Sequence, residues 1–172
     1  MTPIYIKMAR KKTFAKSPRI RSGGQTGVDR AALDAAVATG RIYEGWCPKG
    51  GWAEDFPHRP GLLSKYPHLR ETPSEFPEQR TEWNVRDSAA TVVYAHYHSR
   101  GTDFTIACAK TYGKPCCIIH YLDDDAIIGF RKVMSRFGEE QSINIAGPRE
   151  SEHPGAYERC LALLIEVLGW HQ

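Results

Sequence analysis

Hydrophobic positions along the chain fall into two patterns, short apolar or alternating runs and runs spaced by three or four residues. The first pattern predicts strands at 19–22, 43–47, 91–97, 115–121 and 142–146. The second predicts helices at 28–39, 102–112, 123–137 and 154–168, and a mostly polar helix at 78–88. Because strands and helices alternate, we expect an α/β fold in three layers, with a mainly parallel sheet covered by helices on both faces.

The stretch 48–77 interrupts this alternation. It contains six of the eleven prolines and is longer than most connections in a compact domain. Loops of this length are usually functional or disordered, so we expect an irregular loop without a strand.

The composition is that of an ordinary soluble chain, with 172 residues, 41% hydrophobic and 25% charged. No apolar run approaches the ~20 residues that span a membrane. The N-terminus has charge but lacks the apolar segment of a secretion signal. We therefore expect a cytoplasmic protein that does not bind membranes.

The net charge of +3 is unevenly distributed. Seven of the 23 Lys and Arg residues lie in 1–28, which contains no acid, so the rest of the chain is acidic. We predict a basic N-terminal arm at 1–18 and a single domain at 19–172. The arm is either a solvated tail or a nucleic-acid contact. A basic run alone favours the tail, so we expect no nucleic-acid partner.

The five cysteines form no CxxC motif and are odd in number, which favours reduced thiols. Cys116 and Cys117 lie on the apolar run 115–121, which is typical of a strand inside a parallel sheet. Burial therefore explains them better than metal binding. His96 and His98 share one side of a strand end but have no evident third ligand. We predict no metal bound directly by protein side chains.

The stretch Ser22–Arg30 lies between a predicted strand and a predicted helix. Its glycines allow a ligand to approach the backbone, and the helix start adds unpaired N–H groups. The spacing fits neither a Walker A motif nor GxGxxG. The glycines could serve only a tight turn, but the polar content favours an anion site formed by Gly23, Gly24, Gln25, Thr26, Gly27, Asp29 and Arg30.

Two further loops follow strands in the same way. One supplies Gly101, Thr102 and Thr105, and the other, 147–151, supplies Arg149 and Ser151. The carboxyl ends of parallel strands share one rim of a sheet, where ligands of open α/β folds bind. We therefore expect the three loops to surround one phosphate-binding site.

Two other polar groups are candidates for the same site. Arg80, Thr81 and Asn84 lie on one face of the helix at 78–88, which could equally be a solvated surface. Lys49, Glu54 and Asp55 open the long loop. These carboxylates could act as a general base, accept N–H groups of a heterocycle, or form a charged loop tip.

Long stretches of the chain resemble the putative molybdenum carrier family, a circularly permuted branch of the SLOG superfamily of Rossmann-like domains. The stretches that carry the resemblance are 23–34, 45–50, 53–55, 80–81 with 84–85 and 87–88, 101–102, 113–115 and 146–149. The resemblance implies a Rossmann-like domain that binds a nucleotide-derived or pterin-type ligand, with molybdenum cofactor or a nucleotide as the expected occupant. Arg100 departs from the family's Gly-Gly-Thr loop, where it could clamp a phosphate or block a backbone contact. The segment after Gly50 also differs from the family's pattern.

Three functions remain open from the sequence. The first is a non-catalytic carrier or sensor of a small phosphorylated ligand, since no nucleophile–base pair is evident. The second is a nucleotide N-glycoside hydrolase like the phosphoribohydrolases of the superfamily, with Asp29, Glu54 or Asp103 replacing the missing glutamate. The third is a nucleic-acid-binding module that uses the basic arm. The sequence leaves homo-oligomerisation open.

Overall fold

The computed structural model describes residues 17–97 and 99–169. Six strands form one sheet, with bounds β1 Arg19–Arg21, β2 Tyr43–Cys47, β3 Leu69–Glu71, β4 Ala90–Tyr94, β5 Cys116–Ile119 and β6 Ser142–Ala146. The helices are α1 Val28–Ala38, the 3-10 helix η1 Gly61–Ser64, α2 Pro77–Arg86, α3 Arg100–Thr111, α4 Ala126–Met134 and α5 Ala156–Gly169.

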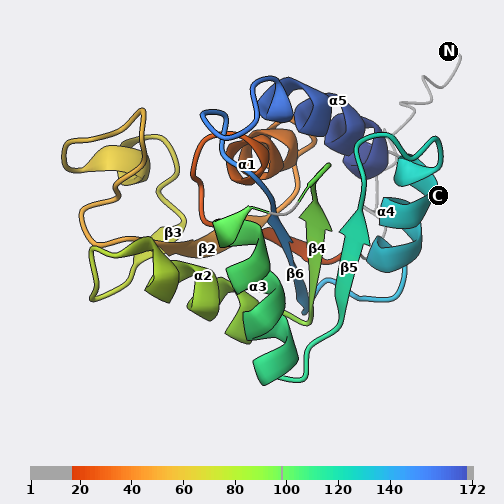
Figure 1. The fold of residues 1–172 in the computed structure, drawn as a ribbon, viewed down its shortest axis with the longest axis horizontal. Helices are drawn as coiled ribbons and strands as arrows, with labels where there is room; N and C mark the ends of the chain where they lie inside the picture. Colours follow the sequence, from red (N-terminus) through yellow and green to blue (C-terminus); the bar gives the residue numbers. More distant parts are fainter. Residues whose placement is uncertain (1–16, 98, 170–172) are drawn as a thin grey trace, which may run out of the picture.

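The strand order is β3-β2-β1-β6-β4-β5, and every pair is parallel. Helices α1, α4 and α5 cover one face of the sheet, and α2 and α3 cover the other (Figure 1). Connections that run toward β3 and those that run toward β5 lie on opposite faces, as right-handed crossovers require. The predicted three-layer Rossmann-like architecture is confirmed.

The core lies between the central strands and the face formed by α1 and α5. Val92 of β4 and Ile143 and Ile145 of β6 are completely buried. Helix α1 presents buried alanines to the sheet and to α5, and these small side chains allow close helix packing. The rigid centre of the sheet therefore fixes the ends of β1, β4 and β6.

Two elements differ from the sequence prediction. The segment 48–77 contains η1 and the strand β3, which pairs with β2, so the prediction of a loop without a strand was wrong. Three residues with only Leu69 buried give too little periodicity to recognise. The run 115–121 was predicted inside the sheet, but β5 is its edge strand, and Ile118 is 39% exposed.

The predicted arm at 1–18 lies outside the described residues except for Ser17 and Pro18. Within the part of the chain that is described, none of the helices combines the length and apolar character needed to cross a membrane.

Candidate functional site

A cavity of about 620 Å³ opens at the carboxyl ends of β1, β4 and β6. Helix α5 follows β6 on one face of the sheet, while α3 follows the neighbouring β4 on the other. Such a divergence opens a crevice between adjacent strands, the usual ligand position in this fold class. The three loops predicted to share one rim all contribute to its lining, together with α2.

In the glycine loop, residues 22–30, two glycines lie in close contact with other parts of the chain. A Cβ on Gly23 would lie 2.0 Å from Nη1 of Arg80, so only glycine leaves room for that guanidinium. Gly27 has φ +75°, and a Cβ there would lie 2.3 Å from the carbonyl oxygen of Pro148. The Val28 amide donates a hydrogen bond to the same oxygen at 3.2 Å. These glycines allow α2 and the β6–α5 loop to pack directly against the start of α1.

A buried ion pair crosses the floor of the cavity. Nη1 of Arg80 donates to Oδ2 of Asp29 at 2.6 Å, with the side chains 12% and 5% exposed. Burial raises the pKa of the Asp29 carboxyl, while the charge of Arg80 and its hydrogen bond act in the opposite direction. The pair connects α1 to α2 and places a carboxylate in the wall of the cavity.

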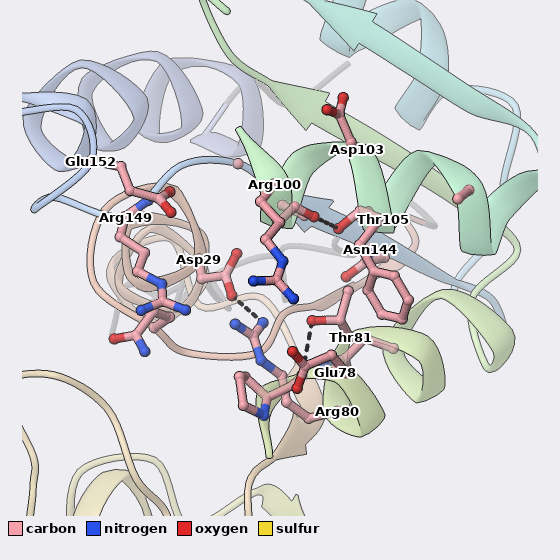
Figure 2. A pocket seen from close by; sticks show the side chains of 18 residues that line it. Asp29, Glu78, Arg80, Thr81, Arg100, Asp103, Thr105, Asn144, Arg149 and Glu152 are labelled. Carbon is pink, nitrogen blue, oxygen red and sulfur yellow. Dashed lines mark hydrogen bonds and ion pairs between the residues drawn. The ribbon is translucent and has the colours of Figure 1, made fainter. Parts of the chain in front are cut away.

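Two more arginines reach the same space. Arg100 begins α3, and Arg149 lies in the β6–α5 loop. Figure 2 shows their guanidinium groups and that of Arg80 gathered around Asp29. Across residues 17–97 and 99–169, neither Arg100 nor Arg149 forms a side-chain ion pair. Two cations therefore face the cavity without a side-chain ion pair in the described chain, while the charge of Arg149 acts to lower the pKa of Asp29 and of Glu54.

Acids also line the cavity, but at exposed positions. Glu78, Asp103 and Glu152 are all exposed, in contrast to Asp29. Figure 2 shows the Asp103 carboxylate turned away from the three guanidinium groups. Oε2 of Glu152 accepts a hydrogen bond from the Arg149 backbone amide at 3.2 Å. Arg100 is exposed as well, and Arg149 is half-buried, so solvent also screens these two cations. The buried charges of the cavity are those of Asp29 and Arg80.

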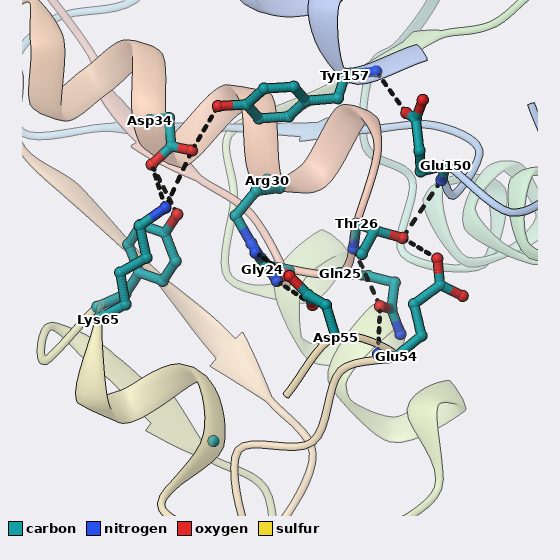
Figure 3. Close-up of polar contacts among 12 residues, drawn as sticks. Gly24, Gln25, Thr26, Arg30, Asp34, Glu54, Asp55, Lys65, Glu150 and Tyr157 are labelled. Carbon is teal, nitrogen blue, oxygen red and sulfur yellow. Dashed lines mark hydrogen bonds and ion pairs between the residues drawn. The ribbon is translucent and has the colours of Figure 1, made fainter. Parts of the chain in front are cut away.

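A second set of polar contacts joins the loops beside the cavity (Figure 3). Oε1 of Gln25 accepts hydrogen bonds from the amides of Thr26 and Glu54, both at 3.0 Å. The hydroxyls of Thr26 and Ser151 donate to the two carboxylate oxygens of Glu54. Partial burial raises the pKa of Glu54, but hydrogen bonds from Thr26 and Ser151 together with the charge of Arg149 hold the pKa below the usual range.

Arg30 and Asp55 also bind each other. Nη1 and Nη2 of Arg30 donate to the two Asp55 oxygens at 2.7 and 2.8 Å, and Nε donates to the Gly24 carbonyl at 3.0 Å. The hydrogen bonds from Arg30 lower the pKa of the Asp55 carboxyl. This two-pronged contact fastens the long loop to α1, so both side chains serve the scaffold.

Other predicted polar side chains bond within or between helices and strands. Asn84 accepts from the Trp46 amide at 2.8 Å and donates to the Trp46 carbonyl at 2.9 Å, which fixes α2 to β2. The Thr105 hydroxyl donates to the Gly101 carbonyl at 2.9 Å, and the Thr102 hydroxyl lies 3.1 Å from that of Ser99. The Thr81 hydroxyl donates to the Pro77 carbonyl oxygen at 3.1 Å.

The structure divides the predicted site residues into three groups. The lining of the 620 Å³ cavity includes Gln25, Asp29, Arg80, Thr81, Asn84, Gly101, Thr105 and Arg149. A neighbouring cavity of about 520 Å³ includes Lys49, and Arg149 again. Neither lining includes Gly23, Gly24, Thr26, Gly27, Arg30, Glu54, Asp55, Thr102 or Ser151.

Sequence reasoning missed several lining residues, among them Phe104, Asn144 and Glu152. Asn144 is 2% exposed and donates to the Thr91 hydroxyl at 3.3 Å. A signal for it existed, because it is a polar residue inside the apolar run Ile143–Ala146.

No group of three or more His, Cys, Asp or Glu side chains that could hold a metal ion occurs among the described residues. His98, one of the two histidines considered above, lies outside them.

Residues 20–168 match the Circularly permutated YpsA SLOG family. The chain belongs to this family. The crystal structure of the putative molybdenum carrier protein from Syntrophus aciditrophicus SB is similar, with 35% identity and a TM-score of 0.75. The match covers 89% of this chain and 97% of that one. None of the curated proteins compared with the chain matches it.

Membership of the SLOG family confirms the resemblance drawn from the glycine loop and the later motifs. The family match begins at β1 and ends in α5, so it includes every element that lines the cavity.

Proposed function

We propose that the chain binds a small phosphorylated heterocycle, a nucleotide or a pterin, in the 620 Å³ cavity and acts as its carrier or sensor. Molybdenum cofactor is the first candidate, since the similar crystal structure is named for a molybdenum carrier. One observation supports the proposal above all others. The guanidinium groups of Arg100 and Arg149 face the cavity beside the Asp29–Arg80 pair, without an ion-pair partner in the described chain.

The cavity fits such a ligand in size and chemistry. Its volume falls within the ~300–1,000 Å³ common for small-molecule sites. Guanidinium groups bind phosphate through paired, charge-assisted hydrogen bonds. Molybdenum cofactor carries a phosphate and an aminopyrimidinone edge, whose N–H groups need an acceptor. Of the carboxylates first considered for that edge, Asp29 lines this cavity, whereas Glu54 and Asp55 bond to other side chains outside it.

Calorimetry on the full chain tests the proposal. Molybdenum cofactor under anaerobic conditions, GMP and inorganic phosphate are the probes. Loss of a charged hydrogen bond costs about 2 kcal/mol, so Arg100→Ala should weaken binding ~30-fold. Lys110→Ala is the matched control, since Lys110 lies in the last turn of the same helix. If the wild type binds none of the probes, the proposal is wrong.

One observation favours a second function, hydrolysis of the N-glycosidic bond of nucleoside monophosphates. Asp29 and Asp103, two of the three acids considered for this role, line the cavity. Chromatography of GMP incubated with the chain would then show free guanine, and Asp103→Asn would abolish its release. Binding of GMP without release of guanine would leave the carrier function alone.

A further inference from the structure

The neighbouring cavity of about 520 Å³ has no role in the proposal above. Its lining is formed by Lys49, Gly50, Trp52, Pro57, Arg59, Glu75, Pro77 and Arg149. Pro77 and Arg149 also line the first cavity, so these two residues form the boundary between the spaces. A ligand group bound at Arg149 can therefore extend in either direction.

The second cavity combines an aromatic surface with positive charge. Trp52, Pro57 and Pro77 supply apolar surface, and Lys49 and Arg59 supply cations. In the described part of the chain, neither of these cations forms an ion pair. One acid, Glu75, is also present at an exposed position.

The Trp52 indole is available to a planar ligand. Trp46 packs edge-on against Trp83 at 4.8 Å between ring centroids, and Arg70 and Arg86 lie over these two rings. Within residues 17–97 and 99–169, by contrast, no ring or cation contact involves Trp52. An indole of this kind beside unpaired cations is the combination that binds a base and its phosphates.

Backbone hydrogen bonds hold the walls of this cavity in place. The Leu62 amide donates to the Gly51 carbonyl at 2.7 Å, and the Lys49 amide donates to the Ser74 carbonyl at 2.9 Å. A Cβ on Gly50 would lie 3.2 Å from Nε of Arg59, so the Arg59 side chain passes directly over the glycine. The second cavity is thus formed by anchored segments around 49–62 and 74–77.

We propose that the physiological ligand is a dinucleotide, in which two heterocycles are joined through a diphosphate. One phosphorylated heterocycle occupies the first cavity, the diphosphate lies at Arg149, and the second base stacks on Trp52. Lys49 and Arg59 neutralise the added phosphate charge. This inference rests on the proposed function of the first cavity and specifies the class of its ligand.

Calorimetry with matched probes tests the inference. GMP is compared with di(guanosine-5′) diphosphate, and molybdenum cofactor with its guanine dinucleotide form. Stacking of one base on an aromatic side chain should make each dinucleotide bind about 10- to 100-fold more tightly. Trp52→Ala should remove this gain and leave the affinity for GMP unchanged, while Trp52→Phe should keep most of it. Arg59→Ala should reduce the gain, and Lys132→Ala on α4 serves as the charge control.

The outcomes separate the two proposals. If GMP binds and the dinucleotides bind no more tightly, the dinucleotide inference is wrong and the proposed function stands. If Trp52→Ala weakens GMP and dinucleotide binding equally, the inference is also wrong. If the wild type binds none of the four compounds, the proposed function itself fails. Should Trp52→Ala not fold, as judged by circular dichroism, Arg59→Ala provides the test, because it should reduce the dinucleotide gain, and an unchanged gain would contradict the inference.

Discussion

Replacing Arg80 with methionine tests the role of the ion pair beneath the cavity. Nη1 of Arg80 lies 2.6 Å from Oδ2 of Asp29, and both side chains are largely buried. Methionine retains much of the aliphatic stem but has no charge. The Asp29 carboxylate would then remain 5% exposed without its cation.

The size of the effect follows from burial. Breaking a buried ion pair by removing one partner costs about 3–5 kcal/mol. The adjoining cavity gives water some access to Asp29, so we expect a loss near the lower end, ~3 kcal/mol in the free energy of unfolding at pH 7. The double variant Arg80→Met with Asp29→Asn removes the uncompensated charge and should recover at least half of this loss.

The loss should depend on pH. Burial raises the pKa of Asp29 and Arg80 opposes that rise, so Arg80→Met moves the folded-state pKa further above the unfolded value of ~3.9. A carboxyl with a raised folded-state pKa contributes stability that is complete below the unfolded pKa and lost as pH rises through the folded pKa. The deficit of the variant should therefore grow from acidic to neutral pH.

Urea unfolding of wild type, Arg80→Met and the double variant at several values between acidic and neutral pH measures these quantities. A deficit that is the same at every pH would refute the electrostatic reasoning. So would a double variant that is no more stable than Arg80→Met at neutral pH.

Three further predictions follow from single contacts. Gly23→Ala places a Cβ 2.0 Å from Nη1 of Arg80 and 2.9 Å from Oδ2 of Asp29, so it should destabilise the wild type in urea more than the Arg80→Met background, which keeps only the second contact. Asn84→Ala removes two hydrogen bonds to the Trp46 backbone and should cost about 2 kcal/mol, measured by thermal unfolding; an unchanged Tm would contradict the contact. Burial raises the pKa of Cys47 to about 11, so iodoacetamide at pH 8 should modify this thiol only after unfolding, as read by peptide mass spectrometry.

The sequence predicts the buried elements of the fold well. The bounds predicted at 43–47 and 142–146 are those of β2 and β6, because most of their residues face the core and carry a clear apolar pattern. Strand β3 escaped recognition because one buried residue, Leu69, does not make a pattern. The position of β5 at the edge could not be predicted, since an apolar run does not specify how many neighbours a strand has.

The site is predictable at the level of loops but not of side chains. Parallel strands bring their carboxyl ends together, so three polar loops on one rim follow from the alternation of elements. Thr, Asn and Gln can bind a ligand or their own backbone with equal ease. The Asn84 side chain bonds to the backbone of Trp46, which lies 38 positions away in the sequence. Only the folded chain brings the Asn84 amide group and the Trp46 backbone within 3 Å.

Some polar side chains of the loops bond to the protein itself and others face the cavity, and this difference determines which residues can recognise a ligand. Gln25 and Thr26 hold the loops together, so recognition falls to side chains that keep free charge. The cavity is lined by three arginines and four acids, and the guanidinium groups of Arg80, Arg100 and Arg149 gather around Asp29 (Figure 2). A phosphate monoester carries roughly −1.5 to −2 charges at neutral pH, so it can pair with Arg100 and Arg149, which form no ion pair in the described chain. Because such a ligand binds the folded chain and not the unfolded one, it should raise the free energy of unfolding as it binds.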